Sequence, residues 1–269
     1  MTAHDWELQI SEGQLARLTA EMDEAHRATL PAMRTGALDL GEEIRARRGD
    51  EPRDAGRRRF LLGAGGAALA LTLAACSSSK PTGAPPTSGS SSAPPSGSVS
   101  GQYTGDLKVV ALAVALENQA VGAYQAALDA AKAGKLGTVP PAVATFVTTA
   151  MAQHADHAKA WNAVLTGAGK PAITNVPLTN QAATTEALGK AASVGDVAKL
   201  ALQLEDQAAQ TYLFATYNVT SPAGIATAAT IAPVEAMHAA ILNYVLGQYP
   251  VPDDFLPVDK AASPTLLTV

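Results

Sequence analysis

The chain has 269 residues, of which 47% are hydrophobic and 16% charged, and its formal net charge is −5. All of its arginines lie at or before position 59, so the rest of the chain carries only scattered lysines and a modest acidic excess. Binding to a nucleic-acid backbone requires clustered cations, so we expect no nucleic-acid partner. The single cysteine excludes an intramolecular disulfide.

Residues 1–55 precede a basic cluster and are interpreted as a long cytoplasmic leader. Its middle, ISEGQLARLTAEMDEAHRA, combines helical periodicity with charges of both signs, which predicts a solvated helix. His26 lies beside Glu24 in this stretch, and we expect no site there. The sequence assigns no function to the leader.

Residues 56–76 have the pattern of an export signal: a basic cluster, an apolar run from Phe60 to Ala75, and Cys76. The apolar run is shorter than the ~20 residues that span a bilayer, and its glycines weaken it further as a spanning helix. We therefore expect a signal here, with a permanent transmembrane anchor as the lesser alternative.

Two motifs in this segment resemble known export motifs. The sequence LAAC, which ends at Cys76, resembles a lipobox, in which the cysteine becomes the lipidated first residue of the mature protein. The other motif resembles the core of a twin-arginine signal and consists of Arg57, Arg58, Phe60 and Leu61. The resemblance implies the twin-arginine export machinery as a partner, which carries folded proteins. It also implies a lipid anchor on the outer face of the cytoplasmic membrane.

Residues 77–102 are rich in Ser, Gly and Pro and are predicted to form a disordered tether. The remaining residues, about 165 from position 103 onward, suit one domain with one sizeable core. A lipid-anchored bundle at the end of such a tether would stay close to the membrane.

The domain has helical periodicity and no sustained alternation of the strand type. Between the second and third helices lies a long connection with one short helix near 183–192. Two short links and one long one predict an all-α four-helix bundle over 103–248, made of two hairpins joined by a crossover. We expect residues 249–269 to pack over it as an extended tail. The four predicted helices span residues 105–133, 141–167, 196–218 and 222–247.

The first and third predicted helices contain a near repeat, LENQAVGAY at 116–124 and LEDQAAQTY at 204–212. Helical spacing places Glu117 and Glu205 in the middle of apolar stripes, so both carboxylates point inward. A buried ionised carboxylate costs several kcal/mol unless a cation or strong donors meet it. The repeat therefore indicates a cation or strong hydrogen-bond donors at the bundle centre.

The second and fourth helices also match, HADHAKAWNAVLTG at 154–167 against EAMHAAILNYVLGQ at 235–248. A spacing of three places both members of each polar pair on one helical face. After Cys76 the chain has only three histidines and four glutamates, and all but Glu186 fall in the repeats. Three carboxylates and three imidazoles in an apolar bundle suit divalent metal ions. The predicted site residues are Glu117, His154, His157, Glu205, Glu235 and His238.

This arrangement resembles the ferritin-like di-metal superfamily, in which two helices each give a Glu and two each give Glu-x-x-His. The resemblance implies that Glu117 and Glu205 are terminal carboxylates and Glu235 a bridging one, with imidazoles from His157 and His238. His154 is the departure, because it stands where a second bridging Glu is expected. A mononuclear site, an asymmetric pair and a zinc site are all compatible with it.

The resemblance implies iron, with manganese and zinc as alternatives, and oxidation of the metal or activation of oxygen or peroxide. The alternative is a non-catalytic lipoprotein scaffold or binding module whose buried polar residues bond to one another. One chain supplies all four helices, so we expect a monomer or dimer and no storage cage. Two residues could in principle replace the missing Glu as a ligand. Asp156 points away from the site on a straight helix, and Gln153 is a weaker candidate still.

Tyr124 and Tyr212 lie two turns from their glutamates. We interpret them as core tyrosines whose hydroxyls bond to a carboxylate across the bundle and orient the metal ligands. The alternative interpretation is a redox-active tyrosine beside the metal. Trp161, one turn after His157, is expected in the core.

Overall fold

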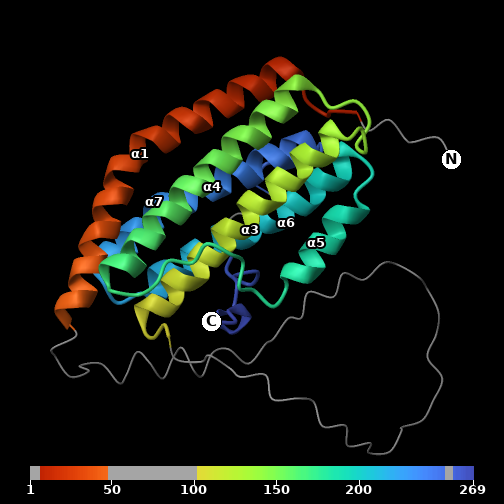
Figure 1. Ribbon diagram of the computed structural model, residues 1–269. Helices are drawn as coiled ribbons and strands as arrows, with labels where there is room; N and C mark the ends of the chain where they lie inside the picture. The colour runs from red at the N-terminus through yellow and green to blue at the C-terminus, as the bar shows by residue number, and fades with distance from the viewer. Residues whose placement is uncertain (1–6, 48–101, 252–256) are drawn as a thin grey trace, which may run out of the picture. The chain divides into compact units, whose positions relative to one another are not determined.

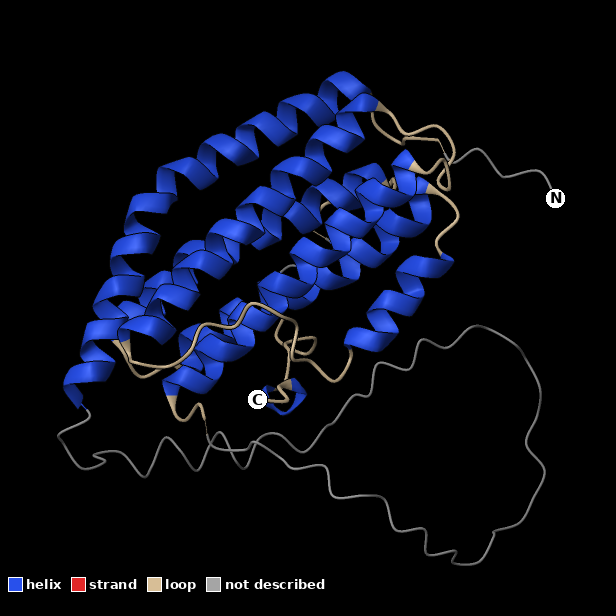
Figure 2. Cartoon of the chain, in the orientation of Figure 1, coloured by secondary structure: helices blue, strands red, loops and turns tan. Residues whose placement is uncertain are grey.

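The computed structural model describes residues 7–47, 102–251 and 257–269. Within these ranges the regular secondary structure is helical, and a single isolated bridge joins Leu178 to Leu267 (Figure 2). This confirms the all-α prediction. The residues of the predicted signal and its lipidation position lie outside the described ranges, namely Arg57, Arg58, Phe60, Leu61 and Cys76.

The four predicted bundle helices are present, each with ends within two residues of those expected. A further helix, α5 (Gln181–Lys190), lies in the long connection. The four are α3 (Asp106–Lys132), α4 (Pro141–Gly167), α6 (Val194–Asn218) and α7 (Pro222–Val245).

Local sequence signals set the ends of these helices. Ser221 caps α7, since its side chain accepts a hydrogen bond from the backbone N–H of Gly224, and proline occupies the first helical position. Gly134 and Gly137 adopt φ of 71° and 73° in the turn after α3, where other residues would be strained. The turn is short, so α4 runs back along α3.

The helices form two hairpins, α3 with α4 and α6 with α7, which pack together as a bundle (Figure 1). Helix α5 packs against α3 and α6. Along each bundle helix the polar residues at mid-length separate two apolar clusters. The predicted pair of hairpins with a crossover is therefore confirmed.

The predicted leader contains a long helix, α1 (Glu12–Ala46), which packs on α4 and α7 as part of the same compact unit (Figure 1). The expectation of a solvated helix is wrong, because one face of α1 is buried in both apolar clusters. Pro31 interrupts the helical hydrogen bonding midway, where α1 bends. The buried residues are Leu15, Thr19, Met22, His26, Met33, Ala37, Leu40 and Gly41.

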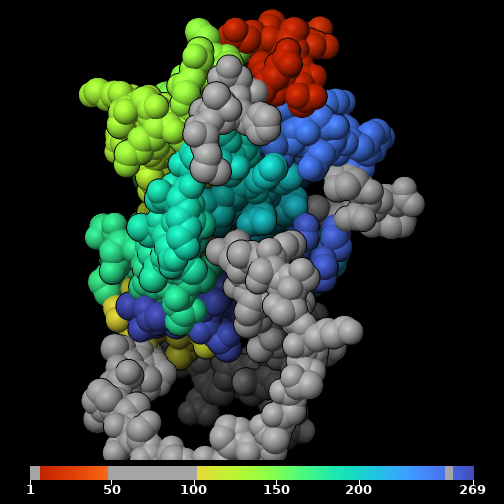
Figure 3. Space-filling model, turned by 90° about the vertical axis from the view of Figure 1, so that its right-hand side faces the viewer, coloured from red at the N-terminus to blue at the C-terminus, as the bar shows by residue number. Residues whose placement is uncertain are grey.

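Glycines allow α1 to approach its neighbours closely. A Cβ added to Gly36 would lie 2.5 Å from Oγ1 of Thr227 on α7, so no side chain fits there without a shift. A Cβ added to Gly41 would lie 3.5 Å from Cα of Gly167 on α4. At its other end, the chain entering α1 lies beside the end of α7 (Figure 3). A Cβ added to Gly247 would lie 3.0 Å from Cγ of Gln9.

Helix α7 is the one helix in the described ranges that is long and apolar enough to cross a membrane. Half of that apolar stretch is buried inside the protein, and it carries two fully buried polar residues, Glu235 and His238. Its composition is that of a core helix.

The described part of the tail, residues 257–269, packs over the crossover and α6. The backbone N–H of Thr179 donates to the carbonyl of Leu266, and that of Ala262 donates to Oγ1 of Thr211, at 2.9 and 2.7 Å. Residues 257–269 are extended apart from a turn at 258–260 and one turn of 3-10 helix at Pro264–Leu266.

Candidate metal centre

Six polar residues from all four bundle helices converge at mid-length in the bundle. Each is at most 2% exposed to solvent. They are the six residues that the two sequence repeats predict: Glu117 on α3, His154 and His157 on α4, Glu205 on α6, and Glu235 and His238 on α7.

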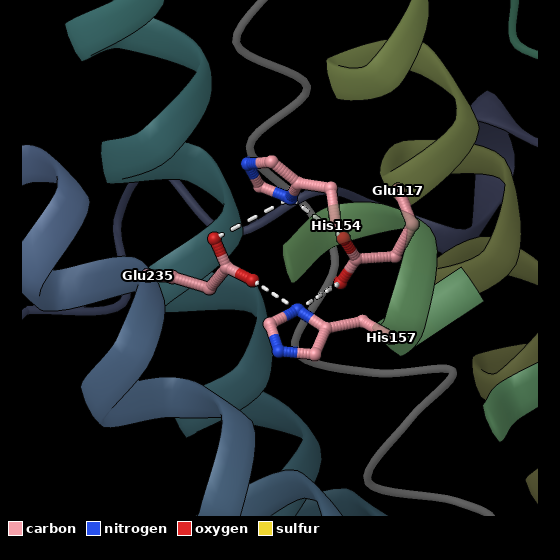
Figure 4. Close-up of side chains that lie close together, drawn as sticks. All are labelled: Glu117, His154, His157 and Glu235. Carbon is pink, nitrogen blue, oxygen red and sulfur yellow. Dashed lines mark hydrogen bonds and ion pairs between the residues drawn. The ribbon is translucent and has the colours of Figure 1, made fainter. Parts of the chain in front are cut away.

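One half of the centre is formed by Glu117, His157 and Glu235 (Figure 4). Nδ1 of His157 lies 2.8 Å from Oε1 of Glu235 and 3.5 Å from Oε1 of Glu117. The shorter contact has the length of an ion pair but not the direction of a hydrogen bond, and both of its atoms lack a hydrogen-bond partner among the described residues. Two ligand atoms at about 2.1 Å from one ion would be about 3.0 Å apart at a right angle and about 3.4 Å apart at a tetrahedral angle. This buried pair therefore fits a shared cation.

The other half is formed by Glu205, His238 and the second oxygen of Glu235. Nδ1 of His238 lies 3.2 Å from Oε2 of Glu205 and 3.2 Å from Oε2 of Glu235. The two oxygens of Glu235 thus face different histidines, Oε1 towards His157 and Oε2 towards His238. This orientation suits a carboxylate that bridges two sites.

His154 lies between the two terminal carboxylates. Its Nδ1 is 2.7 Å from Oε2 of Glu117, and its Nε2 is 3.0 Å from Oε1 of Glu205. Carboxylates only accept, so the ring donates to both when it is protonated on both nitrogens. One imidazole therefore reaches both halves through different atoms, where the family pattern has a carboxylate.

The charges compensate one another when no metal is bound. Burial alone would lower the pKa of His154, but the charges of Glu235 and Glu205 raise it well above its usual value. Burial would also lower the pKa of His157, but the charge of Glu117 raises it to about 9. Burial opposes ionisation of Glu117, yet the neighbouring His157 and His154 lower its pKa to about 2. The metal-free centre is thus a set of imidazolium–carboxylate pairs.

The two tyrosines bond to carboxylates across the bundle, as predicted. Tyr124 donates its hydroxyl hydrogen to Glu205, and Tyr212 donates to Glu117. Burial and the carboxylate charges raise both pKa values well above the usual range, so both hydroxyls stay protonated. Trp161 is buried and donates from Nε1 to the Tyr212 hydroxyl at 2.9 Å.

Gln153 contacts a site histidine rather than taking a ligand position itself. Its Oε1 lies 2.8 Å from Nε2 of His238, and its amide donates to Oδ1 of Asp23 on α1 at 3.3 Å. Asp156 points away from the centre, as expected, and pairs with Arg34 of α1 at 3.0 Å.

His26, at which the sequence predicts no site, lies at the edge of the centre. It is 2% exposed, and its ring lies 5.2 Å, centroid to centroid, from that of His157. Burial and the charge of His157 lower the pKa of His26 to about 4, so this imidazole is neutral near pH 7. The sequence feature that could have indicated its burial is its helical spacing with the apolar residues Met22 and Met33.

Small hollows reach the centre from the side opposite α1, between α3 and α6. One is lined by Glu117, His154, Gln119, Gln207 and apolar neighbours and has a volume of about 10 Å³. A second, of similar volume, is lined by Tyr124 and Glu205. Each has room for about one water molecule.

Two overlapping groups of four residues can each place one ligand atom around a common point. One contains Glu117, His154, His157 and Glu235, and the other contains His154, Glu205, Glu235 and His238. Each offers two carboxylates and two imidazoles, and His154 and Glu235 belong to both.

Comparisons with known proteins agree with this geometry. Residues 105–248, more than half of the chain, match the family described as a ferritin-like domain. A search of curated proteins and a search of solved structures each found no match. The matched region contains all four bundle helices and all six converging residues, and the chain belongs to the ferritin-like domain family.

Proposed function

We propose that the bundle binds a divalent metal ion at its centre. The observation that carries this proposal is the contact between Nδ1 of His157 and Oε1 of Glu235, which lie 2.8 Å apart, buried and without a hydrogen bond. A buried ring nitrogen and a buried carboxylate oxygen at this distance need a proton or a cation between them, and a metal ion could take the place of the proton. Both residues belong to a four-residue group with the donor types of a metal site.

The donor set fits iron, manganese and zinc, and the resemblance to the ferritin-like superfamily favours iron. Mixed imidazole and carboxylate ligands suit first-row divalent ions, and open positions beside such ligands are typical of non-haem iron. Zinc is equally compatible with two imidazoles and two carboxylates in a closed tetrahedral site. The absence of thiolates in both groups argues against ions that prefer soft ligands.

The position of His154 favours one tightly held ion over a symmetric pair. Its Nδ1 lies beside Glu117 and its Nε2 beside Glu205, so a neutral ring that ligates in one half donates a hydrogen bond in the other. The half with the unpaired contact, formed by Glu117, His157 and Glu235, is our choice for the first ion. The second half retains Glu205, His238 and the other oxygen of Glu235 for a weaker one.

Several residues of the chain would hold and shield a bound ion. The hydroxyls of Tyr124 and Tyr212 fix the terminal carboxylates, and Gln153 fixes the ring of His238. Iron or manganese held here would supply one-electron redox chemistry. The hollows between α3 and α6 are small, which favours a small reactant, and the resemblance to the ferritin-like superfamily suggests molecular oxygen or a peroxide.

Metal binding is expected to strengthen as the pH rises and to release protons. The pKa of His157 is raised to about 9, so at neutral pH its Nδ1 must lose a proton before it can ligate. Calorimetric titration with Zn²⁺ should show affinity rising by about tenfold per pH unit for each proton released, until the pH passes that pKa. The His157→Gln variant should release fewer protons than wild type. An affinity that does not change with pH would contradict ligation by these imidazoles.

A second candidate function is a scaffold without metal. The observation in its favour is that His154 and the terminal carboxylates already satisfy one another. In a scaffold, a partner would bind at the surface of the bundle. The buried histidines and glutamates would then serve only to fix how the four helices pack together. Metal content of the purified chain separates the two candidates.

The location follows from sequence motifs alone. We propose that the twin-arginine machinery exports the folded bundle and that a lipid on Cys76 tethers it to the outer face of the cytoplasmic membrane. Export in the folded state would allow metal loading in the cytoplasm, where supply is controlled. Labelling with a radioactive fatty acid should mark wild type and not Cys76→Ser.

A further inference from the structure

Helix α1 brings its own histidine against a predicted ligand. His26 lies edge to face with His157, with ring centroids 5.2 Å apart. Nε2 of each ring has no hydrogen-bond partner among the described residues, although both side chains are buried. No direct hydrogen bond joins the two rings, so a link between their nitrogens would need a bridging water.

The same helix also contacts the second predicted histidine ligand, through a relay. Nε2 of His238 lies 2.8 Å from Oε1 of Gln153, and because an amide oxygen only accepts, that nitrogen carries the proton. The Gln153 amide in turn donates to Oδ1 of Asp23 at 3.3 Å. The relay leaves Nδ1 of His238, the nitrogen that faces the carboxylates, free to ligate.

We propose that helix α1 is the outer wall of the metal centre and that it positions both terminal imidazoles, His238 through Asp23 and Gln153, and His157 through His26. This rests on the metal site proposed above. Metal-ligating histidines usually donate their second N–H to a partner that fixes the tautomer and ring orientation. On the side of the bundle that faces α1, Asp23 and His26 occupy the places where such partners are needed.

Packing alone does not account for these residues. The rest of the buried face of α1 is mostly apolar, with Leu15, Met22, Met33 and Leu40 almost fully buried. An apolar residue in place of His26 would fill the stripe without burying an unpaired nitrogen. A polar group in that position is therefore better explained by what it faces, which is His157.

The place of α1 in the chain adds a consequence. It precedes Cys76, so processing at the predicted lipobox would cut the covalent link between this wall and the bundle. Helix α1 would therefore be covalently linked to the bundle only in the precursor. That is the stage at which, on the proposal above, metal is loaded in the cytoplasm.

The test compares Co²⁺ binding by the full 269-residue chain and its point variants. His26→Leu removes the ring nitrogens, His26→Gln retains a donor and an acceptor, and Asp23→Ala ends the relay. Glu24→Ala, an exposed neighbour on the same helix, is the matched control. Affinity is measured by competition with a chromogenic chelator, and the visible bands of bound Co²⁺ report the ligand geometry.

We expect His26→Leu and Asp23→Ala to bind Co²⁺ about 10- to 100-fold more weakly, with shifted bands. His26→Gln should recover most of the affinity, and Glu24→Ala should match wild type. Wild-type affinity and bands in His26→Leu and Asp23→Ala would overturn the positioning role and leave the metal site standing. If His26→Leu fails to fold, Asp23→Ala decides the question by the same criteria. A wild-type chain that binds no Co²⁺ would overturn the metal site itself.

Discussion

Replacing Glu235 with glutamine is expected to abolish metal binding in both halves of the centre. Glu235 belongs to both four-residue groups, and its two oxygens face His157 and His238 separately. The substitution keeps the volume of the side chain but removes the charge that both histidines and any bound ion require. It also leaves buried imidazolium groups short of a counter-charge, which typically costs about 3–5 kcal/mol of stability.

Equilibrium dialysis against Zn²⁺ and thermal unfolding of the metal-free chain would measure the two effects. Glu186→Gln is the matched control, because Glu186 is the one glutamate after Cys76 that lies outside the centre and it is exposed on α5. Retention of a full equivalent of Zn²⁺ by Glu235→Gln would contradict the bridging position of Glu235.

Replacing His154 with glutamate is expected to make folding depend on metal. The substitution restores the two Glu-x-x-His pairs of the family pattern and so provides four carboxylates and two imidazoles. Without metal, the added carboxylate and the lost imidazolium leave Glu117 and Glu205 without their shared donor. We expect the metal-free variant to lose several kcal/mol relative to wild type.

With Fe²⁺ or Mn²⁺ in excess under anaerobic conditions, His154→Glu should bind two ions per chain and regain stability, since a ligand that binds only the folded state stabilises it. His154→Gln, which adds no charge, serves as the control and should not gain a second ion. A His154→Glu chain that is as stable as wild type without metal would show that the buried charges of the centre are not balanced as described.

The bundle and its centre could be predicted because their signals are local. Helical periodicity, glycines and prolines set the helix ends, and the two repeats placed each inward residue on a known face. Glu117 and Glu205 were predictable from their apolar surroundings alone. The tyrosine contacts followed from the same twofold pattern, since each tyrosine reaches the carboxylate of the other hairpin.

The wall formed by α1 could not be predicted in the same way, because it depends on packing between segments far apart in the chain. The stripe of Leu15, Met22, Met33 and Leu40 was present in the sequence, but the mixed charges on the other face of α1 made the helix resemble a solvated one. The contacts of Gln153 could not be predicted for the same reason. Only the fold shows that its amide lies between His238 and Asp23.

The measurement that tests the central claim most directly is the metal content of the full chain, purified from cells supplied with iron, manganese and zinc. The wild type is compared with the Glu117→Ala, Glu205→Ala double variant, which removes one terminal carboxylate from each half. We predict about one to two equivalents of metal in the wild type and none in the variant. No metal in a well-folded wild-type chain would contradict the account and leave a scaffold whose buried residues bond only to one another.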